Sequence, residues 1–118
     1  MKILVVHRQE MIVDMIKSTL QDNSPVVIHC DSGFDGLLTS RIESFDLIIC
    51  GVDLPVVTGF EMVRSIRNSA LNKNVPVIFT ADELDTKTEY LAKALRVAGT
   101  MRHADIHEKL PAMVGETI

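Results

Sequence analysis

The sequence predicts one α/β domain in which a parallel β-sheet is covered by helices on both faces. Short apolar runs of strand length alternate with amphipathic stretches of helix length along the chain, and such alternation is typical of parallel sheets. Residues 47–50 form an unbroken apolar run, as in a strand that is buried on both faces. The 118 residues, 47% of them hydrophobic, suffice for one core, so we expect a single domain over residues 1–118.

Four strands are expected at residues 3–6, 26–30, 47–50 and 75–80, with a weaker candidate at 100–104. Pro76 is tolerated because it lies near the start of its strand. Between these strands, four stripes of apolar residues follow the spacing of a helix face. They are Ile12, Met15, Ile16 and Leu20; Phe34, Leu37, Leu38 and Ile42; Phe60, Val63, Ile66 and Ala70; and Leu91, Ala94, Leu95 and Ala98.

Several residues mark where the helices begin and end. Thr58 with Glu61 predicts a capping box at the start of the third helix, and Ser32 with Asp35 resembles one at the start of the second. Gly99 suits the left-handed position after the fourth helix. A last helix is expected after Asp105, but an interior proline costs about 3 kcal/mol, so Pro111 predicts a kink or an early end near Leu110.

Composition excludes several classes of protein. The formal net charge of −4 argues against binding to a nucleic-acid backbone. No apolar run approaches the length of a membrane span, and the N-terminus lacks the pattern of a signal peptide, so a cytoplasmic location is expected. Cys30 and Cys50 both lie in apolar strand-like runs and are interpreted as small hydrophobic residues, without a disulfide or metal.

In a sheet of this kind, ligands bind just beyond the carboxyl ends of the strands. The third strand runs out at Gly51, a turn follows at Pro55, and a helix begins after Thr58. Side chains at positions 51 and 53 would therefore project into the place where chemistry is expected.

The chain resembles the receiver domains of bacterial two-component response regulators over nearly its whole length. The resemblance rests on residues 3–6, on 46–49 continuing through Pro55 to Gly59, on 75–81, and on Ala98 with Gly99. It implies the flavodoxin-like (βα)5 fold, with a five-stranded parallel sheet in the order 2-1-3-4-5. It also implies phosphoryl transfer to an aspartate at the end of the third strand, with Mg²⁺ held by acidic residues after the first.

This chain departs from that pattern at its reactive positions. The family's nucleophile lies four residues before the proline, which here is Gly51. The acidic pair falls on His7 and Arg8, and neither supplies the oxygen that Mg²⁺ prefers. The family's hydroxyl is retained as Thr80, and its lysine falls most plausibly on Arg102. We therefore expect a degenerate phosphorylation site that binds no Mg²⁺ or other metal.

Other interpretations of the same residues remain open. Asp53 is a substitute phosphoacceptor in one of them, and in another Arg8 takes the vacated metal space and pairs with Asp53 or Asp82. His7 and His103 could approach each other across the strand ends, which is a weak metal signal because dedicated sites use three or four ligands. Arg8 and Arg102 could together bind an anion beside helix N-termini.

The leading hypothesis is a non-enzymatic pseudo-receiver that binds a signalling or output protein independently of phosphorylation. One alternative is a receiver phosphorylated at Asp53, and the other is an anion or small-ligand binder at the strand ends. The resemblance implies that partners, or a second copy in a homodimer, would use the face formed by the fourth helix, the fifth strand and the fifth helix. No membrane contact is expected.

Overall fold

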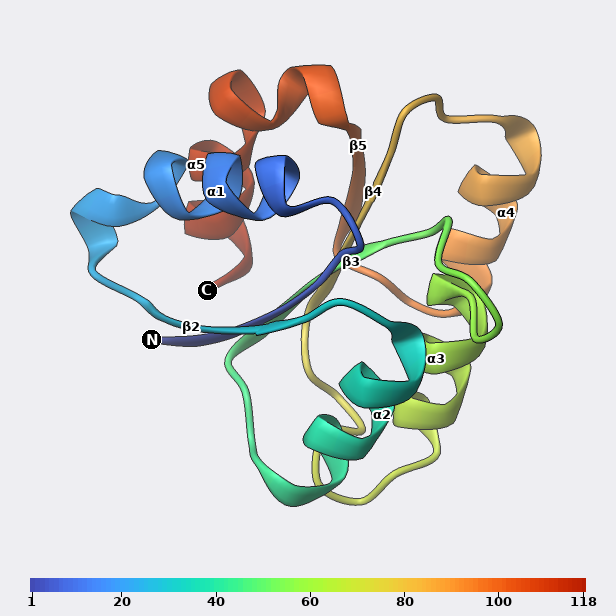
Figure 1. Ribbon diagram of the computed structural model, residues 1–118. Helices are drawn as coiled ribbons and strands as arrows, with labels where there is room; N and C mark the ends of the chain where they lie inside the picture. The colour runs from blue at the N-terminus through green and yellow to red at the C-terminus, as the bar shows by residue number, and fades with distance from the viewer.

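The computed structural model describes all 118 residues and contains one five-stranded parallel sheet (Figure 1). The strand order is β2-β1-β3-β4-β5, which confirms the predicted order 2-1-3-4-5. The strands are β1 (Lys2–Val6), β2 (Val26–Cys30), β3 (Leu47–Gly51), β4 (Val77–Ala81) and β5 (Gly99–Arg102). Gly51 pairs with Thr80, and Ala81 pairs with Arg102, so the carboxyl ends of the strands share one edge.

Helices cover both faces of the sheet, as Figure 1 shows. One face carries α1 (Glu10–Thr19) and α5 (Ile106–Thr117), and the other carries α2 (Gly33–Ile42), α3 (Gly59–Arg67) and α4 (Thr86–Ala94). Alternate strand residues divide the core in two, because successive side chains point to opposite faces. In β1, Leu4 and Val6 join the core under α3, and Ile3 and Val5 join the core under α1 and α5. None of the helices is both long and apolar enough to cross a bilayer.

The start of α3 is as predicted. Thr58 Oγ1 accepts from the Glu61 amide, and Glu61 Oε1 accepts from the Thr58 amide, both at 3.1 Å. The helix ends at Arg67, earlier than its apolar stripe suggested, so Ala70 lies outside it and is exposed.

Three of the four residues of the predicted α2 stripe face solvent, contrary to the usual orientation of an amphipathic helix. Phe34, Leu38 and Ile42 are exposed, and only Leu37 packs against the core. Gly33, Gly36 and Ser40 form the buried side of the helix. The Ser32 hydroxyl accepts from the Asp35 amide at 3.2 Å, so the predicted cap is present.

The prediction for Gly99 is wrong. Gly99 is the first residue of β5 and its φ is not positive, whereas Arg96 takes the left-handed conformation after α4, with a φ of 57°. An added Cβ at Gly99 would lie 2.6 Å from Met113 Sδ, so this flexible side chain would have to shift.

The predicted early end of the last helix is also wrong, because α5 continues through Pro111 to Thr117. Leu110 and Val114 are buried against the sheet on either side of the proline. Burial of two such side chains contributes about 1.5–3 kcal/mol each, which offsets the cost of an interior proline. Asp105 precedes α5 as predicted, but its side chain makes no capping hydrogen bond.

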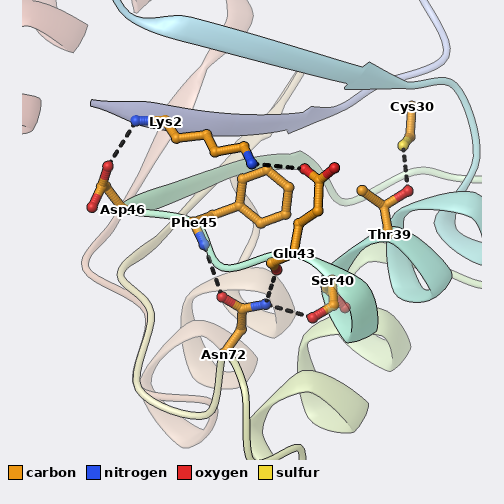
Figure 2. A network of polar contacts seen from close by, with 8 residues as sticks. All are labelled: Lys2, Cys30, Thr39, Ser40, Glu43, Phe45, Asp46 and Asn72. Atoms are coloured by element: carbon orange, nitrogen blue, oxygen red, sulfur yellow. Dashed lines mark hydrogen bonds and ion pairs between the residues drawn. The ribbon is translucent and has the colours of Figure 1, made fainter.

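A buried asparagine fixes the chain between α2 and β3 (Figure 2). Asn72 Oδ1 accepts from the Phe45 amide at 3.0 Å, and Asn72 Nδ2 donates to the carbonyls of Ser40 and Glu43. Lys2 contacts the same segment twice. Its Nζ forms an ion pair with Glu43 Oε2 at 2.9 Å, and its backbone amide donates to Asp46 Oδ2 at 2.7 Å. These bonds satisfy backbone groups at the end of α2 that no helix or strand partner reaches.

At the same end of the sheet, the Arg67 guanidinium is buried and donates only to backbone carbonyls. Nε donates to Leu95, Nη1 to Lys73 and Val75, and Nη2 to Arg96, at distances of 2.6–3.2 Å. One side chain thus ties the end of α3 to the segments before β4 and before β5.

Candidate functional site

The carboxyl ends of β1, β3, β4 and β5 enclose a small polar cavity of 30 Å³. Such a volume has room for about one or two water molecules and is too small for a nucleotide. It is lined by His7, Arg8, Gln9, Gly51, Asp53, Thr80, Ala81, Asp82 and His103. The structure therefore brings together all the predicted site residues except Arg102.

His7, rather than Arg8, fills the space beside Gly51. The His7 side chain is only 5% exposed, and a Cβ added at Gly51 would lie 3.0 Å from its Cδ2 and 3.2 Å from its Nε2. The space into which a side chain at position 51 would project is therefore occupied by an imidazole. The prediction that Arg8 fills this space is wrong.

The buried imidazole begins a chain of hydrogen bonds that ends at an exposed carboxylate. The Gln9 amide donates to His7 Nδ1 at 3.0 Å, so the proton of neutral His7 resides on Nε2. His7 Nε2 lies 2.9 Å from His103 Nε2, which must then accept, and His103 Nδ1 lies 2.8 Å from Asp82 Oδ1. The predicted approach of the two histidines is confirmed, and one backbone amide sets the tautomers of both.

Burial is the largest of the effects that lower the pKa of His7 to about 4. The neighbouring His103, Arg8 and His29 lower it further, whereas Asp82 raises it. His7 is therefore neutral at pH 7, as the hydrogen-bond chain requires.

The Arg8 guanidinium lies outside this chain and binds Asp53. Arg8 Nη2 is 3.0 Å from Asp53 Oδ2, which confirms one of the two predicted pairings. Asp82, the other predicted partner, binds His103 instead. Both Arg8 and Asp53 are exposed, so their ion pair stabilises the fold by at most about 1 kcal/mol.

The hydroxyl of Thr80 is buried beside the cavity. Thr80 is 1% exposed, and its Oγ1 has no hydrogen-bond partner within the protein. Its β-strand position, opposite Gly51, keeps it at the centre of the site.

Arg102 does not reach the cavity. Its Nε binds Asp105 Oδ2 at 3.0 Å, and this hydrogen-bonded pairing raises the pKa of Arg102 and lowers that of Asp105. His103, one residue later, projects into the site instead. The weak strand pattern at residues 100–104 did not define the register at this strand end.

The remaining histidines and cysteines lie outside the cavity. The exposed His29 donates from Nε2 to the His7 carbonyl at 3.0 Å, and His107 is exposed on α5. Both cysteines are free: Cys50 is buried as predicted, whereas Cys30 is half-buried. No group of three or more His, Cys, Asp or Glu side chains is arranged to hold a metal ion.

The loop beside the site contains a strained turn. The Val57 amide donates to the Pro55 carbonyl at 2.7 Å, and the intervening Val56 has a φ of 65°. Turns of this kind are rare, and a β-branched residue at positive φ is unfavourable. Val56 is also 95% exposed, so no burial of its side chain compensates for the strain.

We therefore expect Val56→Asn to raise the free energy of unfolding by about 1 kcal/mol, because asparagine tolerates positive φ. Urea unfolding monitored by circular dichroism measures the change. Val26→Asn is the matched control, since Val26 is exposed on the edge strand β2 and has no positive φ. An equal gain in both variants would show that the strain at Val56 is not the cause.

Residues 3–103 match the family described as the response regulator receiver domain. The cell cycle transcriptional regulator CtrA of Caulobacter vibrioides is 25% identical over 92 residues, which cover 78% of this chain and 40% of CtrA. The transcriptional regulatory protein CusR of Escherichia coli is 31% identical over 78 residues, covering 66% of this chain and 34% of CusR. The chain thus matches less than half the length of these relatives.

Solved structures agree with this assignment. The chemotaxis protein CheY4 of Vibrio cholerae has a TM-score of 0.90 and 28% identity, with 99% of this chain and 98% of that one covered. A receiver domain protein of Clostridium thermocellum has the same fold, with a TM-score of 0.84, 24% identity, and coverage of 99% and 93%. The family match over residues 3–103 includes the whole cavity and all five strands except Lys2, the first residue of β1. The chain therefore belongs to the response regulator receiver domain family.

Proposed function

We propose that this receiver domain is a non-enzymatic protein-interaction module in two-component signalling that acts without phosphorylation of its own. The observation that carries the proposal is the pairing of Gly51 with His7. Gly51 offers no nucleophile at the carboxyl end of β3, and the His7 imidazole occupies the space that a side chain there would need.

The donor set around the cavity also does not suit Mg²⁺, which prefers oxygen ligands. The two side chains after β1 supply an imidazole and a guanidinium, and the Asp53 carboxylate is already bound by Arg8. Thr80 retains its hydroxyl, but its position opposite Gly51 faces no acceptor side chain.

The test is incubation of the protein with acetyl phosphate and Mg²⁺, followed by intact mass spectrometry. We expect no added phosphoryl mass, because the acceptor position has no carboxylate. CheY4 of Vibrio cholerae, the structural relative with 28% identity, serves as a parallel receiver sample. A phosphoryl adduct that disappears in Asp53→Ala would overturn the proposal.

Such an adduct would favour the second candidate, a receiver phosphorylated at Asp53. Asp53 is exposed at the strand end, two residues beyond Gly51, and is accessible to a phosphodonor. Its ion pair with Arg8 opposes this role, because the guanidinium already binds the carboxylate that would have to accept the phosphoryl group. Arg8→Ala would then increase the adduct if Asp53 were the acceptor.

The third candidate is an anion binder at the strand ends. Arg8 and the unpartnered Thr80 hydroxyl both line the cavity, whose 30 Å³ suits only a small inorganic ion. Thermal shift measurements with phosphate, sulfate and nucleotides test it, and stabilisation by none of them would remove it. A homodimer through α4, β5 and α5, a cytoplasmic location and the lack of nucleic-acid binding stay predictions.

A further inference from the structure

The exposed face of α2 carries an apolar stripe that no part of this chain covers. Phe34 is 57% exposed, Leu38 is 47% exposed and Ile42 is 78% exposed, and they follow one another at intervals of four residues. Residues four apart lie on one side of a helix, so the three side chains form a continuous ridge. Contiguous exposed apolar surface of this kind marks sites of protein interaction.

The rotation of α2 is fixed by its buried side. An added Cβ at Gly36 would lie 2.8 Å from both Val6 and Met62, and one at Gly33 would collide with the Val57 carbonyl oxygen. A roll of the helix that buried the ridge would bring larger side chains into these narrow contacts. The end of α2 is held by Asn72 through the Ser40 and Glu43 carbonyls (Figure 2). The ridge is therefore presented on a rigid element.

The ends of the ridge differ in charge. Beside its first half lies an open groove of 510 Å³ between the end of β2 and α2, lined by His29, Cys30, Asp31, Asp35, Leu38 and Thr39. The carboxylates of Asp31 and Asp35 have no ion-pair or hydrogen-bond partner. Neither takes part in any of the five ion pairs that the protein forms between a basic side chain and a carboxylate. Burial is the main reason that the pKa of the Cys30 thiol is raised, and the negative charges of Asp35 and Asp31 raise it further. Both carboxylates therefore act on the groove that Cys30 lines.

Arg41 lies at the opposite end of the ridge. Its guanidinium contacts only the Ser65 hydroxyl, at 3.5 Å, and pairs with no carboxylate. Asp35 and Arg41 are six residues apart, which corresponds to about 9 Å along the helix axis. The face is thus apolar along its length, acidic at one end and basic at the other.

We propose that this α2 face binds an amphipathic helix of a partner protein that carries Lys or Arg at one end of its apolar side and Asp or Glu about two turns away. The apolar side chains of the partner would rest on Phe34, Leu38 and Ile42. Its cations would enter the groove beside Asp31 and Asp35, and its carboxylate would meet Arg41. This partner chemistry rests on the proposed interaction function and assigns it to the α2 face, which is separate from the α4, β5 and α5 face that the family resemblance implies.

A second copy of α2 does not supply the same complementarity. In a two-fold pair of antiparallel helices, each flank of the ridge faces its own equivalent. Helical periodicity places Asp35 and Arg41 on opposite flanks, so Asp35 would not meet Arg41 of the other copy. The charge pattern therefore favours a different helix over self-association.

The test uses ¹⁵N-labelled protein and synthetic helical peptides of about 18 residues that share three leucines at intervals of four. One peptide carries lysines at one end and glutamates at the other, and the control peptide carries glutamates at both ends. We expect the first peptide to shift backbone amide resonances within residues 29–42, and the control peptide to bind at least tenfold more weakly. Leu38→Lys should weaken binding of the first peptide at least tenfold, and Asp31→Asn with Asp35→Asn should weaken it severalfold at low salt.

Met11→Ser is the matched control variant, because Met11 is another exposed large apolar side chain but lies on α1. It should leave binding unchanged, and thermal unfolding of each variant confirms that the fold is retained. Absence of binding, resonance shifts centred outside residues 29–42, or equal binding of both peptides would overturn the proposal. The proposal would also be overturned if analytical ultracentrifugation showed that the unsubstituted chain is a dimer and that Leu38→Lys dissociates it, because the ridge would then bind a second copy of this chain.

These outcomes are separable from the proposed function. A phosphoryl adduct in the acetyl phosphate experiment would overturn phosphorylation independence whatever binds to α2. If no adduct forms and neither peptide binds, the proposed binding surface on α2 is wrong, while the proposal of a phosphorylation-independent role stands.

Discussion

Lowering the pH from 7 to 4 is expected to destabilise this domain by up to about 3 kcal/mol through His7 alone. The pKa of His7 is about 4 in the folded protein, against an ordinary value of 6.5 in an unfolded chain. Between these two values the unfolded state binds a proton that the folded state does not. Stability therefore falls as the pH falls through this window and levels off below pH 4.

The structural cause is that a proton on His7 disrupts the hydrogen-bond chain. Protonated His7 carries a hydrogen on Nδ1, which then faces the Gln9 amide and can no longer accept from it. The groups around the ring include His103, Arg8 and His29, which oppose its charge, and Asp82, which favours it but lies beyond His103.

Urea unfolding at several pH values between 7 and 4 measures this dependence. In His7→Asn, the side-chain oxygen can still accept from the Gln9 amide, but nothing titrates at this position. The variant should show a clearly smaller loss of stability over the window, whereas His107→Asn, at an exposed histidine of α5, should match the wild type. Equal slopes for His7→Asn and the wild type would assign the pH dependence to other groups.

Gly51→Asp is expected to destabilise the fold by about 2–3 kcal/mol and to leave the protein unlabelled by acetyl phosphate. The new Cβ would lie 3.0 Å from the His7 ring, which cannot withdraw without breaking its bonds to Gln9 and His103. The carboxylate would then be buried beside a neutral imidazole, with Arg8 engaged by Asp53.

A double-mutant cycle identifies the steric part of this effect. Gly51→Ala alone should be destabilising, and its cost should shrink by at least about 1 kcal/mol when combined with His7→Ala, since residues in contact couple by this amount. Gly115→Ala is the control, because an added Cβ at Gly115 meets no atom within 4 Å. Efficient Mg²⁺-dependent labelling of Gly51→Asp would instead show that His7 and Arg8 do not exclude the metal.

The strand positions and the location of the site followed from local sequence patterns. Apolar runs placed the five strands to within about two residues, and the spacing from Pro55 identified Gly51. The identity of the residue that faces Gly51 did not follow, because β1 ends at Val6 and the backbone bends immediately afterwards. Which of His7 and Arg8 turns inward depends on the Gln9 amide and on His103, 96 residues away.

The orientation of α2 also could not be predicted from the sequence, because it depends on contacts with residues far away in the chain. Periodicity correctly grouped Phe34, Leu38 and Ile42 on one side of the helix, but it could not show that this side faces solvent. That outcome depends on how closely Gly33 and Gly36 approach Val57 and Met62, which belong to distant segments. The roles of Asn72 and Arg67 were likewise invisible, because they satisfy backbone groups far away in the chain.

The four carbonyl contacts of Arg67 have a mechanical consequence for α4. They hold the residues that follow the C-terminal end of this helix, Leu95 and Arg96, against the end of α3. The other end is tied less firmly: Asp85 caps the helix through the Thr88 amide, and the exposed Glu89 accepts one hydrogen bond from the Thr100 hydroxyl. A displacement of α4 would therefore pivot about its C-terminal end and move its first turn, next to Asp85, farthest. The segment from Asp82 to Asp85 joins that turn to β4, so such a movement would pull on the carboxylate that ends the chain of hydrogen bonds from His7.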